Sequence, residues 1–432
     1  MFETFRNAFK TPDLRKKLLF TFFIIVIFRV GAAIPVPFLD PSAIKELMGQ
    51  SGNLLGYIDV LTGGALSQAT LFAMSITPYI NSSIIIQLLT VAIPPLERLA
   101  KEGEEGRKKI TKITRYVTVV LALVQALGYY FLLKSKGAVQ FTNGFQGVFV
   151  AVVIIATFTA GAALLMWLGE QINEKGIGNG ISMILFAGII SRGPAAFGTL
   201  WEMFKQGMAG QTKYFIIVPA IVVVFIAMIV FIVFVSNAER RIPVQYAKRV
   251  VGRKQYGGQS SHIPIKVNTS GVMPIIFASS ILAVPGTIGA FFNPSAGTFW
   301  YNFISVFKYD HWFYAVLYFI LIIAFNYFYV AIQYNPIEIA NNLRKNNGAI
   351  PGIRPGKPTS DFIVKILSKI TFIGAIFLAI VAICPIIFNK FTGGANIALG
   401  GTSMLIVVGV ALETMRSLES QMMMRHHKGF LE

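Results

Sequence analysis

The chain has few residues of the types and spacing that catalysis requires. It contains four histidines and one cysteine, and it has no HExxH or CxxC motif that could bind a metal. Ser182 follows Gly180 and Ile181 in a pattern that resembles a fragment of an intramembrane serine protease. No histidine lies in a long apolar run to act as the base for this serine. The sequence therefore predicts no catalytic residues and no metal site, and an intramembrane protease is a disfavoured alternative.

Nucleotide-binding motifs are also missing from the sequence. Gly356 and Lys357 would need a glycine five residues before Gly356 to form a phosphate-binding loop, but Pro351 stands there. The glycine-rich run 176–180 lacks the dinucleotide-binding pattern and follows no predicted strand. We therefore expect no cofactor, and the energy for any transport must come from a partner or an ion gradient.

The composition is that of a membrane protein with many spans. Of the 432 residues, 55% are hydrophobic and only 13% are charged, whereas soluble domains carry about 25% charged residues. Disordered chains are poor in aromatic residues, but this chain has 37 phenylalanines. The apolar runs are continuous rather than alternating, which predicts an all-α membrane protein and not a barrel of strands.

Ten apolar runs approach the length of about 20 residues that a spanning helix needs. They cover residues 18–34, 71–93, 116–133, 147–168, 181–199, 214–235, 270–292, 313–334, 370–388 and 398–415. The fifth is the weakest, because Arg192, Gly193 and Pro194 interrupt it. Arg29 breaks the first run, which favours a spanning helix there over a cleaved signal peptide.

Basic residues are concentrated on one side of these ten runs. The chain carries 38 Lys and Arg residues against 19 Asp and Glu, a net charge of +19. Of the 38, 29 lie in the termini and in alternate loops, eight lie in the opposite loops, and Arg29 lies within a span. The positive-inside rule then places both termini in the cytoplasm. The basic excess thus indicates a cytoplasmic face, with long basic loops at 236–269 and 335–369, rather than a nucleic-acid-binding domain.

The spans contain almost no ionisable residues. Apart from Arg192, which interrupts the fifth run and is counted with the loops, only Arg29 and Glu413 lie inside them, and structural anchoring is the favoured role for both. A secondary transporter for a small solute usually shows more such residues, so it stays the runner-up interpretation. Small hydroxyl and amide residues instead crowd onto the second and seventh spans, where interhelical hydrogen bonds are worth about 0.6 kcal/mol each. Bonds of this strength suit a seam between helices that opens.

Five spans in each half predict an N-terminal half at 1–200 and a C-terminal half at 201–432. Because five is odd, related halves would be inverted in the membrane, with a functional site at their interface. The runs 78–84 and 274–281 each have a proline, an isoleucine two residues later and a serine pair. Coincidence in apolar sequence explains this echo equally well.

A short apolar segment, residues 57–67, precedes the second span. It is too short to cross a bilayer, and the pair Gly63 and Gly64 breaks it. Such a segment is either re-entrant, buried within the bundle, or an interfacial helix, and composition alone slightly favours the interfacial helix.

Five runs of sequence are together highly specific. They are ITPYINSSIIIQLL at 76–89, KEGEEGR at 101–107, WLGEQI at 167–172 with GIGNGIS at 176–182, IFASSI at 276–281 and IPGIRPG at 350–356. Through them the chain resembles the SecY/Sec61-alpha family of protein-translocation channel subunits over essentially its full length. The resemblance implies an hourglass pore between two inverted, pseudo-symmetric halves. Unfolded polypeptides would pass through it, and membrane segments would leave it sideways into lipid, without enzymatic chemistry.

The resemblance also implies roles for individual residues. The ring at the waist of the pore would consist of Ile76, Ile80, Ile181, Leu185, Ile276 and Ile406, with Leu185 a departure from the isoleucine usual in the family. The plug that seals the pore from outside would include Tyr57, Ile58, Val60, Leu61, Gly63, Gly64 and Leu66. The lateral gate would include Ser82, Ser83, Gln87, Asn268, Ser279 and Ser280. Docking of partners would use Arg253, Lys254, Arg354 and Lys357.

The partners and location that the resemblance implies are those of a bacterial translocon. The implied partners are the SecE and SecG subunits, the SecA ATPase, the ribosome, and a signal sequence or nascent polypeptide as substrate. Anionic lipids are a further expected partner, because basic residues near a membrane surface gain about 1 kcal/mol each from anionic headgroups. The expected location is the bacterial plasma membrane, with multiple spans and both termini in the cytoplasm.

Overall fold

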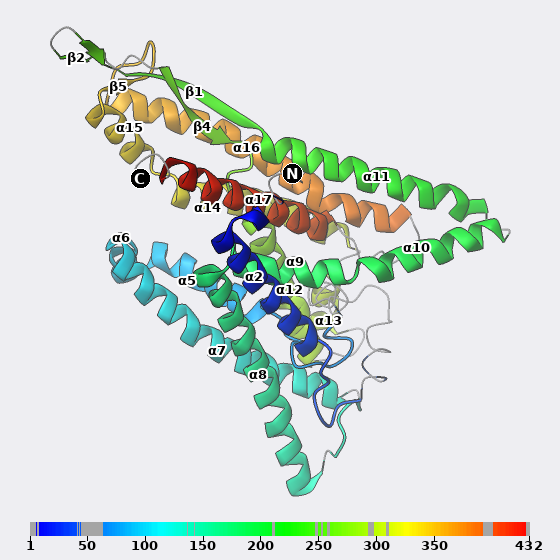
Figure 1. Cartoon of the computed structure of the whole chain (residues 1–432). Helices are drawn as coiled ribbons and strands as arrows, with labels where there is room; N and C mark the ends of the chain where they lie inside the picture. Colours follow the sequence, from blue (N-terminus) through cyan, green and yellow to red (C-terminus); the bar gives the residue numbers. More distant parts are fainter. Residues whose placement is uncertain are drawn as a thin grey trace.

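The structure is a computed structural model of the chain. It describes residues 6, 8–40, 42, 44, 64–135, 137–141, 143–209, 212–246, 249–251, 254–256, 260–292, 298–307, 311–391 and 401–428. Most of these residues are helical, and helices from both halves of the sequence pack around a central region (Figure 1).

The helices of the N-terminal half form one layered group. They are α2 (Pro12–Gly31), α5 (Thr77–Ala92), α6 (Pro94–Lys101), α7 (Glu104–Ser135), α8 (Gly144–Lys175) and α9 (Gly180–Ser191). The long helices α7 and α8 pack against each other, and α5 packs on α7. The chain turns by 101° between α5 and α6, because two prolines at 94 and 95 start α6 and cannot donate the hydrogen bonds that would continue α5.

The helices of the C-terminal half form the second group. They are α10 (Gly193–Met208), α11 (Thr212–Asn237), α12 (Met273–Phe292), α13 (Phe299–Val306), α14 (Trp312–Gln333), α15 (Pro336–Lys345), α16 (Lys357–Phe391) and α17 (Gly401–Lys428). The boundary predicted at residue 200 lies inside α10, which continues to Met208 and packs on α11. A junction at Arg192 separates α9 from α10, at the interruption predicted for the fifth span.

Each of the ten predicted spans overlaps a described helix. Within the described residues, six helices or continuous helix pairs are long and apolar enough to cross a membrane, and the bent pair α5 and α6 would be a seventh. The second span starts at Thr77 rather than at residue 71, because residues 71–76 form turns. The sequence placed the spans correctly but not all of their ends.

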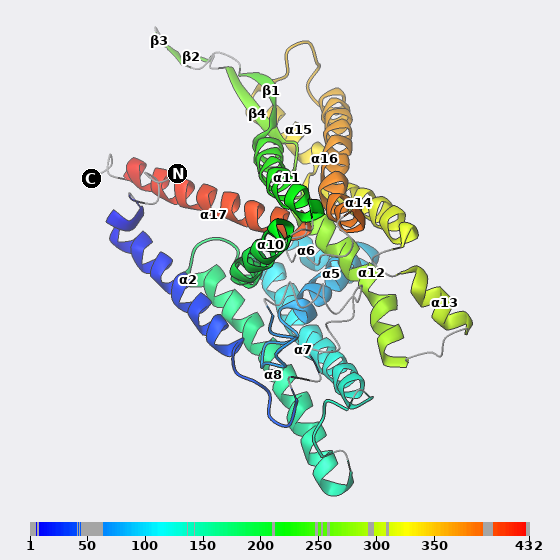
Figure 2. The same ribbon diagram turned by 90° about the vertical axis from the view of Figure 1, so that its right-hand side faces the viewer.

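The two long basic loops fold together into a small sheet. Strand β1 (Glu239–Tyr246) pairs antiparallel with β4 (Ser260–Lys266) on one edge and with β5 (Gly348–Ala349) on the other. A shorter pair, β2 (Arg249–Val251) and β3 (Lys254–Tyr256), continues this hairpin outward. Figure 2 shows the hairpin projecting beyond the ends of the helices. Ile242, Val244 and Ile265 on its inner face pack against residues of α15 and α16.

The hydrophobic core has separate clusters for the halves and a large cluster that joins them. One is built from residues between Val36 and Ala162, and another from residues between Ile232 and Leu412. The joining cluster combines residues of α2, α8 and α9 with Ile406 and Val410 of α17. The region between the halves is therefore apolar, and α17 reaches into it.

Candidate functional site

All six aliphatic residues predicted for the pore ring lie in the cluster that joins the halves. Ile76, Leu185 and Ile406 are buried there, and the other three are partly buried and pack against it. They are Ile80, Ile181 and Ile276. Five of the six lie on α5, α9, α12 and α17, and Ile76 directly precedes α5, so segments of both halves contribute to one apolar cluster.

The start of α9 fixes two of these residues in place. The Asn179 side chain accepts hydrogen bonds from the backbone N–H groups of Ile181 and Ser182, at 3.1 and 3.4 Å, and so caps the helix. Gly180 lies so close to α8 that a Cβ atom there would be 1.9 Å from the carbonyl oxygen of Gly169. Only glycine allows this approach, which turns Ile181 and Leu185 toward the cluster.

Most of the predicted plug lies outside the described residues. Tyr57, Ile58, Val60, Leu61 and Gly63 are all in this category. Gly64 and Leu66 are described. Gly64 has a φ of 89°, and a Cβ atom there would be 3.2 Å from Nη2 of Arg192. Leu66 is buried in the N-terminal core. The described end of the segment therefore packs onto the N-terminal half.

The polar residues predicted for the lateral gate divide between the two sides of the seam. Helix α12 packs against both α5 and α7. The Gln87 amide donates to Ser83 at 3.4 Å within α5, and Ser279 donates to the carbonyl of Ile276 at 2.9 Å within α12. Ser280 is half-buried on α12. The hydroxyl groups of Ser83 and Ser279 therefore bond within their own helices, and the described residues show no hydrogen bond between α5 and α12.

Two more residues predicted for the lateral gate, Ser82 and Asn268, form no hydrogen bond across the seam among the described residues. Ser82 is fully buried and donates to the carbonyl of Thr114 on α7 at 2.8 Å, so its hydroxyl stabilises the N-terminal half. Asn268 precedes α12, and its Oδ1 atom is buried without a hydrogen-bond partner among the described residues. The described part of the chain shows no hydrogen bond between Gln87 and Asn268.

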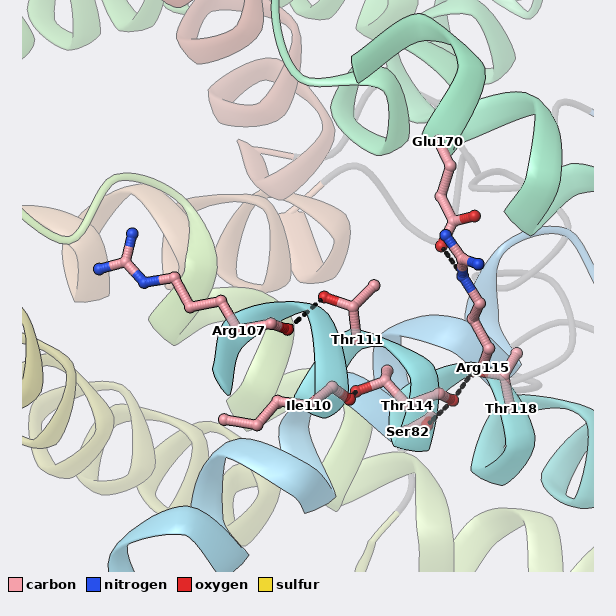
Figure 3. Close-up of polar contacts among 8 residues, drawn as sticks. All are labelled: Ser82, Arg107, Ile110, Thr111, Thr114, Arg115, Thr118 and Glu170. Atoms are coloured by element: carbon pink, nitrogen blue, oxygen red, sulfur yellow. Dashed lines mark hydrogen bonds and ion pairs between the residues drawn. The ribbon is translucent and has the colours of Figure 1, made fainter. Parts of the chain in front are cut away.

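A polar brace that sequence reasoning missed joins α7 to α8. Arg115 Nε lies 2.7 Å from Glu170 Oε1, and the Glu170 side chain is only 12% exposed. Figure 3 shows the two side chains pointing toward each other beside the bond from Ser82 to Thr114. In the sequence, Arg115 is one of several basic residues before a span, so nothing marks it as the partner of a nearly buried carboxylate.

The described docking residues lie in the connections of the C-terminal half that also form the sheet and its neighbouring turn. Arg354 and Lys357 are exposed, and Lys357 begins α16. The turn that presents Arg354 has left-handed glycines at both sides, Gly352 with φ 80° and Gly356 with φ 103°. Lys254 lies in β3, and Arg253 lies outside the described residues.

The apolar spans and the apolar cluster between the halves define a multi-pass membrane protein. The SecY family profile matches residues 70–415 of the chain. A protein translocase subunit SecY from Streptomyces griseus is 46% identical, and one from Bacillus subtilis strain 168 is 45% identical, each over the full length of both chains. The chain therefore belongs to the SecY family of protein translocase subunits.

Solved structures show the same fold. One described as a protein conducting channel is 18% identical, with a TM-score of 0.64 over 94% of this chain and 92% of the other. Sec61 from a canine ribosome-channel complex is 17% identical, with a TM-score of 0.61 over the same shares. The ten-helix architecture expected from the sequence is consistent with this fold, and the chain is a multi-pass membrane protein of the protein-conducting type.

Proposed function

We propose that the six-residue aliphatic cluster is the waist through which unfolded polypeptides pass. The observation that carries this proposal is that Ile80, Ile181, Ile276 and Ile406 come from four different helices and belong to one apolar group. A narrow apolar constriction excludes water and ions by dewetting. It offers no hydrogen bonds to a passing chain, so it has no preference for sequence.

The seam between α5 and α12 is the proposed lateral exit for signal sequences and membrane segments. Its polar residues would be Ser83, Gln87, Asn268, Ser279 and Ser280. Their observed bonds within single helices support easy separation, because opening the seam would break few bonds between helices. Ser82 would instead hold α5 onto α7 while the seam opens. The segment 57–67 is the proposed plug on the opposite face.

The cytoplasmic hairpin and the turn at Arg354 are the proposed docking arms. Exposed arginine suits this role because its planar fork pairs with both carboxylate and phosphate. Two structural neighbours are ribosome complexes, of canine Sec61 and of yeast Ssh1 with the 80S ribosome, which supports the ribosome as a partner. SecE, SecG, the SecA ATPase and anionic lipids are proposed on the family resemblance and the charge asymmetry.

We infer the orientation and organisation of the chain from the same features. Both termini would lie in the cytoplasm of a bacterium, and the halves, about 1–200 and 201–432, would be related by inverted pseudo-symmetry. The chain itself would be passive and not an enzyme, with a partner supplying energy. The runner-up, a secondary transporter, would require gradient-driven uptake of a solute and no export defect when the protein is depleted.

Site-specific crosslinking tests the pore directly. A photoreactive residue at position 80 or 276 should form an adduct with a secretory chain stalled during translocation. The matched control is Val223 of α11, which is 65% exposed on the outside of the protein. It should give no adduct with a fully secreted chain. Equal adducts at all three positions, or none at positions 80 and 276, would contradict the proposed waist.

A further inference from the structure

The cytoplasmic hairpin is joined to the rest of the molecule at a charged root. Its strands converge where Glu239 pairs with Lys266, and the N–H of Val267 donates to the carbonyl of Ala238 at 2.9 Å. The end of α11 leads directly into β1 at this point. Any movement of the hairpin relative to the helices must therefore involve residues 235–239 and 266–267.

Arg416 of α17 binds this root. Its Nη2 donates to the carbonyl oxygen of Ser236 at 3.0 Å and to Oδ1 of Asn237 at 2.8 Å. These two acceptors are the last residues of α11, where the helix dipole and the unpaired carbonyls favour a cation. The two bonds thus tie the last turn of one helix to the middle of another.

Other charges gather at the same root. Burial lowers the pKa of Lys266, the positive charge of Arg416 lowers this pKa further, and the carboxylates of Glu239 and Glu413 raise it. Two cations and two anions from the hairpin and α17 therefore lie within electrostatic reach of one another. This mixture supports a defined junction rather than a chance surface contact.

The opposite side of the same stretch of α17 packs onto the N-terminal half. Leu418 is completely buried in a cluster with Leu14 of α2 and Ile177 before α9. Lys17 of α2 donates to the Gln421 side chain at 3.2 Å. Figures 1 and 2 both show α17 passing between α2 and α11. The helix is therefore held by one half while it binds the hairpin root of the other.

Helix α17 continues from this junction to the proposed pore. No glycine or proline interrupts residues 410–428, so this part of the helix can act as a stiff rod. Ile406 lies about 15 Å along the axis from Arg416, at 1.5 Å per residue. At Gly409 the backbone is so close to the start of α12 that a Cβ atom would be 3.0 Å from Cγ2 of Val272.

We propose that Arg416 is a positioning residue that couples the hairpin to the pore wall. A load that a docked partner applies to the hairpin would pass through the two bonds of Arg416 into α17. From there it would reach Ile406 and the start of α12. This inference rests on the proposed docking role of the hairpin, but its structural part can be tested without any partner.

The partner-free test measures the distance between the hairpin and α17. Nitroxide labels at Ser261 and Met423, both exposed, would be introduced after Cys384→Ser has removed the single native cysteine. In lipid nanodiscs, pulsed electron paramagnetic resonance should give a narrow distance distribution that broadens in Arg416→Ala. Arg416→Lys, which keeps a donor and the charge, should remain close to the parent. An unchanged distribution in Arg416→Ala would overturn the coupling.

The functional test uses proteoliposomes, a secretory preprotein and the SecA ATPase. We expect Arg416→Ala to bind the ATPase normally and unfold at the parent temperature within a few degrees, because the residue is partly exposed. Preprotein transported per ATP hydrolysed should fall about fivefold, the effect of losing roughly 1 kcal/mol of charge-assisted hydrogen bonding. Asn237→Ala should give a smaller loss, and Glu419→Gln, an exposed change one turn away, should give none.

The outcomes separate the two proposals. If the unsubstituted protein transports no preprotein, the proposed function fails, and the distance measurement still decides whether Arg416 holds the hairpin. If the unsubstituted protein transports normally and Arg416→Ala matches it in yield per ATP, the coupling role is wrong. A loss that Arg416→Lys does not restore at all would also contradict it, because a merely structural defect would explain that result.

Discussion

The close approach of α9 to α8 makes Gly180→Ala an informative substitution. The added Cβ would stand 1.9 Å from the carbonyl oxygen of Gly169 and 2.8 Å from Cβ of Ile172. Ordinary contact begins near 3.4 Å, so the two backbones must separate by about 1.5 Å. The shift would move Ile181 out of the aliphatic cluster and strain the bond from the Gly180 N–H to Asn173 Oδ1, now 2.7 Å long.

The expected loss in the stability of the Gly180→Ala variant has two parts. Overpacking of a filled site costs about 1–3 kcal/mol, and weakening the cap at Asn179 adds about 1 kcal/mol. The matched control is Gly198→Ala inside α10, where an added Cβ would meet no atom within 4 Å. Replacing glycine by alanine in a helix should stabilise it by roughly 0.5–1 kcal/mol. The two identical substitutions should therefore change stability in opposite directions.

Two assays would follow the two consequences. The apparent unfolding temperature in detergent should fall by several degrees for Gly180→Ala and should stay level or rise for Gly198→Ala. Conductance of the resting channel in planar bilayers should rise only for Gly180→Ala, because a displaced Ile181 leaves the constriction open to water. Parent-like stability and conductance in Gly180→Ala would refute the role of this contact, as would an equal loss in Gly198→Ala.

Three further substitutions test other parts of the structure. Asn326 is 2% exposed, and its side chain accepts a hydrogen bond from Ser270 and donates one to the carbonyl of Thr371 at 2.8 Å. Asn326→Leu should therefore lower the unfolding temperature by the equivalent of about 1–3 kcal/mol. An unchanged unfolding temperature would show that these hydrogen bonds add nothing to stability. Arg115→Ala should destabilise the protein more than removal of an exposed ion pair would, because it leaves the nearly buried Glu170 carboxylate without a partner charge. The control is Lys101→Ala, which removes an exposed ion pair. The difference between the unfolding temperatures of the two variants measures the effect. Arg354→Glu at an unchanged level in the membrane should reduce translocation, and a normal rate would exclude Arg354 from docking.

The spans could be located from the sequence because the thickness of a bilayer requires long apolar runs. Such runs can be recognised without any knowledge of tertiary contacts. The ring residues, in contrast, came from the family resemblance, since an apolar stripe on a helix looks the same whether it faces lipid, a core or a pore. In the structure the six residues belong to one apolar cluster, which draws on helices as distant in the chain as α5 and α17. Their role at the waist stays a prediction.

The sheet in the two long basic loops could not be predicted from the sequence. Strand β1 has only two buried residues, Ile242 and Val244, among charged neighbours. Pro243 and Pro264 also argue against strands, yet both lie in the paired register of β1 and β4. The third strand is about 100 residues away in the chain. Such a sheet depends on a shared core with α15 and α16, which no local pattern reports.

Hydrogen bonds to backbone carbonyl groups account for the remaining contacts that the sequence did not predict. Ser82 binds the carbonyl of Thr114, and Arg416 binds the carbonyl of Ser236, 180 residues away. A carbonyl is present at every residue, so the acceptor leaves no mark in the sequence. The donor then looks like any other polar residue on a helix, and its direction becomes clear only when the helices are packed.

The unequal division of the proposed waist between the halves has a geometric consequence. Four of its six residues belong to the N-terminal half, on α5, on α9 and just before α5, and only Ile276 and Ile406 belong to the C-terminal half. Separation of the halves would therefore produce an elongated slot with one long lip and one short lip, rather than a round hole that widens evenly. An extended strand and a helical segment would need different separations of the two lips. The width of such a slot can therefore be matched to the shape of the passing polypeptide.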